Sequence, residues 1–113
     1  MSVYNPDKWV VVKIDGNDHP SIYKVFACWY GGYAGSDSWK LNSGITRVSR
    51  EGYVYSFEGS SGSTYECHTD SYGTNFYGQG VLGNMITNAS KNGITIEILP
   101  EDTDWEGIDY GEC

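Results

Sequence analysis

Short strand-like runs at regular spacing are the feature that most constrains the fold of this chain. Between residues 38 and 69, a turn signal containing glycine recurs every eight to ten residues. The runs between the turns are rich in β-branched and aromatic residues, which favour strands. This spacing predicts an antiparallel meander. The stretches that we expect as strands are 8–14, 22–30, 38–42, 45–50, 53–58, 63–69 and 94–99.

The first two of these runs predict a β-hairpin. A polar stretch at 15–21, which contains Gly16 and Pro20, separates run 8–14 from run 22–30. Two strands joined by so short a connection pair in antiparallel fashion. In run 22–30, apolar residues fall on both sides of the alternation. We therefore expect both faces of that strand to be covered, as in a central strand.

After Thr74 the period of the apolar residues changes from that of a strand to that of a helix. The apolar positions at helical spacing are Tyr77, Val81, Leu82, Met85, Ile86 and Ala89. Thr74 is expected to cap the start and Gly93 to end the helix. Gly78, Gly80 and Gly83 would each cost about 1 kcal/mol relative to alanine unless close packing requires them. We predict one amphipathic helix over about 74–91.

Together these elements predict an α+β fold. The economical arrangement is one twisted antiparallel sheet of about six to seven short strands, with the helix packed on one face. A chain of 113 residues suits a single domain, which we place at residues 1–100. Residues 101–113 are interpreted as an acidic C-terminal tail.

Acidic residues dominate the charge and gather near the C-terminus. The chain has 15 Asp and Glu against 7 Lys and Arg, a net charge of −8, and no basic residue follows Lys91. This balance argues against direct nucleic-acid binding, because affinity for phosphates depends on Lys and Arg. The tail is either a solvated end or a docking segment for a basic partner. The residues that would dock are Asp102, Asp104, Trp105, Glu106, Asp109 and Tyr110.

The sequence predicts a cytoplasmic protein. The N-terminal stretch does not look like a targeting sequence, and no window reaches the eighteen or more apolar residues of a membrane span. The three cysteines include no Cys-x-x-Cys pair. An odd number in this arrangement suggests free thiols in a reducing compartment.

Two runs, 29–44 and 59–73, combine aromatic, glycine and small hydroxyl residues at high density. Tyr and Trp supply flat contact area, Ser supplies adaptable hydrogen bonds, and glycine lets a neighbour approach closely. This combination favours a recognition surface over a reaction centre. The candidate binding residues are Trp29, Tyr30, Tyr33, Asp37, Ser38, Trp39, Lys40, Ser43, Ser63, Tyr65, His68 and Tyr72.

The phrases FACWYGGYAGSDSWKLNSGI and GSTYECHTDSYGTNFYGQGVL carry a resemblance over about residues 22–86. They resemble small uncharacterised accessory proteins of large tailed bacteriophages of the T-even type. The resemblance implies a setting and no settled activity: such proteins act mostly in the infected host cell, by binding and blocking host enzymes or defence systems. The acidic tail departs from the pattern of that group.

Catalytic and metal-binding signatures are weak. Cys67 and His68 are neighbours on an expected strand, so their side chains point to opposite faces and cannot form a nucleophile and base pair. We expect Cys67 to pack inward and His68 to face the other side. The cysteines and histidines have no short metal-ligand spacing. The glycines at 31–35 lack the Lys-Ser/Thr ending of a P-loop. We predict no catalytic residue, no metal and no cofactor.

The leading hypothesis is an acidic binding protein that inhibits or redirects a host protein or a host defence system. It would act as a nucleic-acid mimic where its partner binds nucleic acid. The alternative is a protein that sequesters a small nucleotide signal. Its pocket would be lined by Trp29, Tyr33, Trp39, Lys40, Tyr65 and His68. An enzyme that acts on such a ligand is a further alternative, and a homodimer stays open. The low number of basic residues favours protein binding.

Overall fold

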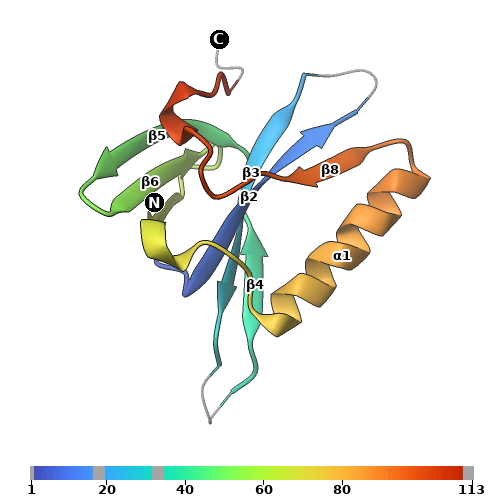
Figure 1. The fold of residues 1–113 in the computed structure, drawn as a ribbon, viewed down its shortest axis with the longest axis horizontal. Helices are drawn as coiled ribbons and strands as arrows, with labels where there is room; N and C mark the ends of the chain where they lie inside the picture. Colours follow the sequence, from blue (N-terminus) through green and yellow to red (C-terminus); the bar gives the residue numbers. More distant parts are fainter. Residues whose placement is uncertain (1, 17–19, 32–34, 111–113) are drawn as a thin grey trace.

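The computed structural model describes residues 2–16, 20–31 and 35–110. It contains two four-stranded sheets and one α-helix (Figure 1). We call the first the outer sheet, whose order is β1 (Val3–Tyr4), β7 (Thr64–His68), β6 (Val54–Gly59) and β5 (Ile45–Glu51). The central sheet has the order β4 (Ser38–Leu41), β3 (Ile22–Trp29), β2 (Lys8–Asp15) and β8 (Thr95–Ile98). Strand pairs are antiparallel in both sheets, except that β1 runs parallel to β7.

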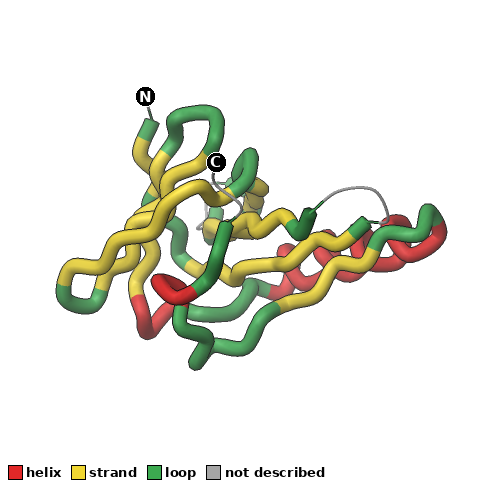
Figure 2. The backbone as a smooth tube through the Cα atoms, turned by 90° about the horizontal axis from the view of Figure 1, so that it is seen from above, coloured by secondary structure: helices red, strands yellow, loops and turns green. Residues whose placement is uncertain are grey.

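The helix α1 (Phe76–Lys91) contacts β8 and β4 of the central sheet. There are also two short 3-10 helices among the described residues. The first, η1 (Thr69–Ser71), lies between β7 and α1, and the second, η2 (Trp105–Gly107), follows β8. In Figure 2 the helix runs alongside strands of the central sheet, while the hairpin strands of the outer sheet extend away from it. Within the part of the chain that the structure describes, no helix combines the length and apolar character needed to cross a membrane.

The central sheet is buried on both faces because β2 alternates between two apolar cores. Trp9 and Val11 join the core shared with the outer sheet, whereas Val10 and Val12 join the core under the helix. Successive side chains on a strand point to opposite faces, so a run without polar residues fits only a strand covered on both sides. The fold is therefore three layers, with the outer sheet, the central sheet and α1 in that order.

The predicted α+β class and the predicted helix are confirmed, and β2 pairs with β3 as expected. The expected central position of β3 is also confirmed, between β4 and β2. The structure differs in having eight strands in two sheets where one sheet was expected. The chain changes sheets between β4 and β5, where the side-chain Oδ1 of Asn42 accepts a hydrogen bond from the backbone N–H of Val25, at 2.8 Å. This side chain ends the pairing of β4 with β3, and the turn at Gly44, with φ of 137°, starts β5 in the other sheet.

The helix begins one residue later than the capping expectation. Asn75, not Thr74, is the N-cap, and its side-chain oxygen accepts a hydrogen bond from the N–H of Gly78 at 2.6 Å. Asn is as good an N-cap as Thr, so sequence preference alone does not separate the two positions. Beyond the other end, Gly93 has φ of 76°, which agrees with the expected stop.

Only the first of the three helix glycines is required by packing. A Cβ on Gly78 would clash with Sγ of Cys28 and lie 3.3 Å from a ring carbon of Phe26. Gly80 and Gly83 would place a Cβ in open space. The absence of a side chain at Gly78 therefore lets the first turn of α1 pack directly against β3.

We expect Gly78→Ala to destabilise the fold by about 1 to 3 kcal/mol, because the added methyl group must displace Cys28 and the helix. Gly83→Ala is the matched control on the same helix and should stabilise the fold by up to about 1 kcal/mol. Urea unfolding followed by circular dichroism measures both changes. Equal effects of the two substitutions would contradict the assigned packing.

Candidate functional site

Three of the predicted binding residues gather around Tyr4. The ring centroid of Tyr4 lies 6.3 Å from that of Trp29 and 5.0 Å from that of Tyr65. The ammonium of Lys40 lies 5.3 Å from the centre of the Tyr4 ring. Tyr65, however, is only 1 % exposed and belongs to the core, which corrects its assignment to a binding surface. The reason is its position on β7, where it faces the central sheet.

Asp37 acts as a link between the loop after β3 and the start of the helix. One carboxylate oxygen accepts a hydrogen bond from the N–H of Gly31 at 3.0 Å, and the other accepts from Nδ2 of Asn75 at 3.4 Å. The same Nδ2 also donates to the carbonyl of Trp29 at 3.3 Å. These bonds join the end of β3, the start of β4 and the N-terminus of α1 into one corner of the molecule.

Large aromatic side chains are exposed around that corner. They are Tyr30 (56 % exposed), Trp39 (37 %), Phe76 (94 %) and Tyr77 (46 %), and we call them the aromatic patch. Trp39 stacks on Phe26 with ring centroids 5.5 Å apart, and Phe26 also lies under Gly78, so Trp39 borders the first turn of α1. Tyr30 follows Trp29, and Phe76 follows Asn75, so the bond between Trp29 and Asn75 places the backbone of these two exposed residues at the same end of the molecule. Figure 1 shows that end, where α1 begins beside β4.

The sequence analysis named half of the aromatic patch. Tyr30 and Trp39 are among the predicted binding residues, and both side chains are exposed in the structure. Phe76 and Tyr77 were missed, because Tyr77 was counted among the residues that face the core. Asn75 is the N-cap and Gly78 packs against the sheet, and both positions between them have exposed side chains. The sequence feature that could have indicated this exposure is therefore the pair of aromatic residues directly after the N-cap.

The predicted serines build turns or lie at strand ends. Ser38 is exposed at the start of β4. The hydroxyl of Ser43 accepts a hydrogen bond from the N–H of Ser61 at 2.9 Å, and the carbonyl of Ser63 accepts from the N–H of Gly59 at 2.8 Å. These contacts hold the turn between β6 and β7 against the turn before β5. Tyr33, the remaining residue of the predicted set in the 29–44 run, lies outside the described residues.

Cys67 and His68 lie as the alternation predicted. Cys67 is fully buried in the core shared by the two sheets, and burial raises the pKa of its thiol. His68 is exposed, and its backbone carbonyl accepts a hydrogen bond from Nε1 of Trp9 at 2.7 Å. Cys28 is also buried, with its thiol pKa raised mainly by burial. Within the described residues no group of His, Cys, Asp and Glu has the arrangement of a metal site.

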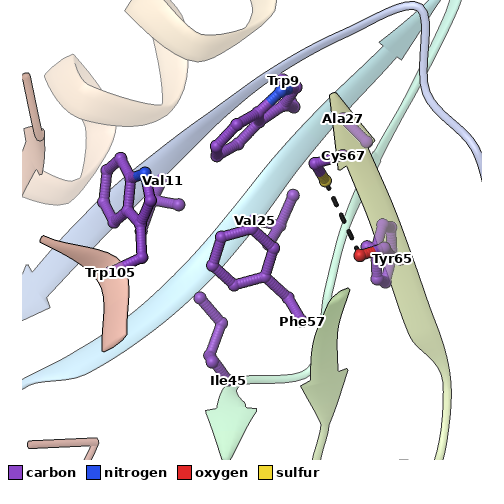
Figure 3. Close-up of a cluster of buried hydrophobic side chains, with 9 residues drawn as sticks. All are labelled: Trp9, Val11, Val25, Ala27, Ile45, Phe57, Tyr65, Cys67 and Trp105. Carbon is purple, nitrogen blue, oxygen red and sulfur yellow. Dashed lines mark hydrogen bonds between the residues drawn. The ribbon is translucent and has the colours of Figure 1, made fainter. Parts of the chain in front are cut away.

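The C-terminal segment is packed on the core as far as Tyr110, which contradicts the first of its two interpretations, a solvated end. Trp105 is 2 % exposed and lies against Trp9 and Phe57, with centroid distances of 5.8 and 6.2 Å (Figure 3). Tyr110 packs edge-on against Tyr23 at 5.4 Å, and its hydroxyl donates to the carbonyl of Trp105. The aromatic residues expected to dock a partner therefore anchor the segment itself. The acidic members of the expected docking set, which are Asp102, Asp104, Glu106 and Asp109, are exposed.

By packing there, the segment closes one side of a pocket of about 510 Å³. The residues that line it are Trp9, Arg50, Tyr55, Thr69, Tyr72, Glu101, Asp102 and Trp105. Of the residues predicted to bind a ligand or dock a partner, Tyr72, Asp102 and Trp105 line this pocket. The pocket lies on the side of the central sheet that faces the outer sheet, whereas Trp39 lies on the helix side.

The comparisons with known proteins add no functional information. No family model matches the chain, and the searches of curated proteins and of solved structures gave no significant match. The functional argument therefore depends on the residues and their geometry.

The half-buried hydroxyl of Tyr72, in the pocket wall, makes the stability of the fold depend on pH. Its hydroxyl accepts from the N–H of Val11 at 3.2 Å and donates to the carbonyl of Leu99. Burial raises the pKa of Tyr72 from its usual value of 10.0 to about 12, and the carboxylate of Glu101 adds to that rise. A folded-state pKa above the unfolded value means that this contribution to stability is complete below pH 10 and is lost as the pH rises toward 12.

We expect the free energy of unfolding to fall as the pH is raised from about 9 to about 11.5, with Tyr72 and Tyr65 contributing, since burial raises the pKa of Tyr65 to about 12 as well. Tyr72→Phe should make the decline shallower. Tyr53→Phe, at a tyrosine that is 77 % exposed, is the control and should leave the slope unchanged. Urea unfolding at each pH measures the slopes, and an unchanged slope for Tyr72→Phe would refute the assignment.

Proposed function

We propose that this chain is a small acidic binding protein that inhibits or redirects a host protein or a host defence system in a bacteriophage-infected cell. The aromatic patch of Tyr30, Trp39, Phe76 and Tyr77 is the observation that carries the proposal. Large exposed apolar side chains that adjoin one another mark interaction sites in soluble proteins, whereas single exposed ones need no explanation.

Phe76 is the strongest member of the patch. A phenylalanine that is 94 % exposed at the first position of a helix contributes little to the packing of its own domain. Aromatic residues are the usual anchors of protein interfaces, because each buries a large rigid area on binding. The hydrogen bonds of Asp37 and Asn75 hold the backbone on both sides of the patch, so little order remains to be gained on binding.

The charge of the protein supports a basic partner. The net charge is −8, and the packed C-terminal segment holds Asp102, Asp104 and Glu106 at the surface in a fixed arrangement. A fixed acidic surface steers a basic protein into contact and repels an acidic one. A partner that normally binds nucleic acid has a basic surface, which the negative charge of this protein would attract. In that case the protein would act as a mimic of nucleic acid.

The geometry gives less support to a nucleotide pocket built from the aromatic and basic residues of the two motif runs. Trp39 lies on the helix side of the central sheet, whereas Trp29 and Lys40 meet Tyr4 on the other side. Tyr65 is sealed in the core. We therefore do not extend the proposal to that alternative.

Phe76→Ala should weaken capture of the partner from bacterial lysate by at least about 2 kcal/mol while leaving the melting temperature nearly unchanged. The matched control is Tyr53→Ala, which removes another highly exposed ring, at the turn between β5 and β6. Tagged variants are compared by the amount of partner retained, with native mass spectrometry of the purified protein alongside. Equal retention by both variants, or a nucleotide bound to the wild type with no protein partner, would contradict the proposal.

Salt provides a second test, of the acidic steering. The association rate with the captured partner should fall steeply between about 50 and about 200 mM salt, because screening shortens the reach of exposed charges. The dissociation rate should change much less, since the aromatic contacts are not ionic. Surface plasmon resonance separates the two rates. An association rate that does not depend on salt would exclude steering by the acidic surface.

A further inference from the structure

The pocket beside the C-terminal segment has walls that are fixed before any ligand binds. Trp9 is held by the hydrogen bond from its Nε1 to the carbonyl of His68. Tyr72 is held at its hydroxyl between Val11 and Leu99, and its ring lies 4.7 Å from Trp9 and 5.7 Å from Trp105. Trp9 and Trp105 are buried, so the rings that the pocket presents to a ligand are those of the half-buried Tyr72 and Tyr55, with the two indoles packed behind them. We call Tyr72 and Tyr55 the aromatic floor. A fixed floor lowers the entropy that a ligand would lose on binding.

The rim of the pocket carries two carboxylates that are available for a ligand. Glu101 and Asp102 both line the pocket and are exposed. Among the described residues, neither of them forms an ion pair. Arg50, the one basic residue of the lining, is turned toward its own hairpin, because its Nε donates to the carbonyl of Gly52 at 2.9 Å. Its charge therefore does not neutralise the carboxylates by direct contact.

Arg50 also shows which chemical group suits this site. Its guanidinium lies 5.3 Å from the centre of the Tyr55 ring, and Tyr55 lines the same pocket. Planar guanidinium groups stack on aromatic faces and bind carboxylates through two parallel hydrogen bonds. A second guanidinium would find aromatic rings below and carboxylates at the rim. A phosphate group would instead meet two negative charges.

We propose that this pocket binds an arginine side chain from an exposed segment of a partner protein, with the guanidinium at Glu101 and Asp102 and the aliphatic stem over the aromatic floor. A volume of about 510 Å³ is ample for one such side chain and its adjoining backbone. The inference goes beyond the proposed function and concerns a different surface, on the other face of the central sheet from Trp39. It stands or falls independently of the aromatic patch.

The test uses the full chain and the peptide acetyl-Gly-Arg-Gly-amide, with its citrulline counterpart as the neutral control of the same shape. Binding is followed by chemical shifts of the indole N–H groups of Trp9 and Trp105, which line the pocket. We expect the arginine peptide to shift these signals and to bind at least about tenfold more tightly than the citrulline peptide. Equal binding of the two peptides, or no shift with either, would overturn the proposal.

Substitutions at the rim determine the sign of the charge that the pocket selects. Glu101→Gln combined with Asp102→Asn should weaken binding of the arginine peptide about tenfold, whereas Glu97→Gln, at an exposed acid on β8, should not. Arg50→Gln should leave binding unchanged or tighten it, because it removes the one positive charge of the lining. Loss of binding in Arg50→Gln, or tighter binding of inorganic phosphate than of the peptide to the wild type, would show an anion site and refute the assignment. All four exposed positions are substituted without a change in the core, so the indole signals also report that the variants remain folded.

Discussion

The burial of Trp9 is the interaction on which the rest of the structure depends. Its indole ring contacts four aromatic residues from three other segments, which are Tyr55 and Phe57 of β6, Tyr72 after η1, and Trp105 of η2. Its Nε1 is paired with the carbonyl of His68, so the ring is buried without an unpaired donor. One side chain of β2 thereby joins the two sheets, η1 and the C-terminal segment. Trp105 also contacts Phe57 of the outer sheet directly, so Trp9 completes a cluster in which the outer sheet and the segment after β8 already touch.

The three-layer arrangement follows from the chemistry of β2 and β3. Strands whose residues are apolar on both sides need cover on both faces, and a chain of this length supplies it with one short helix and one small sheet. Each of the two covering elements, α1 and the outer sheet, then creates one surface feature. The start of α1 produces the aromatic patch, and the gap between the outer sheet and the C-terminal segment becomes the pocket. The two candidate binding features are thus consequences of how one sheet is covered.

Periodicity was sufficient to predict the α+β class, most strands, the β2 and β3 hairpin, and the helix, because these depend on local residue patterns. It could not predict the change of sheet after β4, which depends on the long-range bond between Asn42 and Val25. Composition singled out the aromatic runs but could not show which of their rings are buried. Tyr65 is buried, whereas Tyr30 and Trp39 are exposed, because burial is decided by the neighbours that each strand meets.

The exposed rings are informative because the fold does not need them. The buried aromatic residues fill the core between the two sheets. In a small domain few residues can be buried, so large side chains contribute much of the buried apolar area. Phe76 and Tyr30 fill no such space, and exposing them to water brings no stability to the folded state. Tyr53 is equally exposed but lies alone at a turn, where a single ring requires no functional explanation. Only where several such rings adjoin a rigid corner does their exposure argue for a partner that covers them.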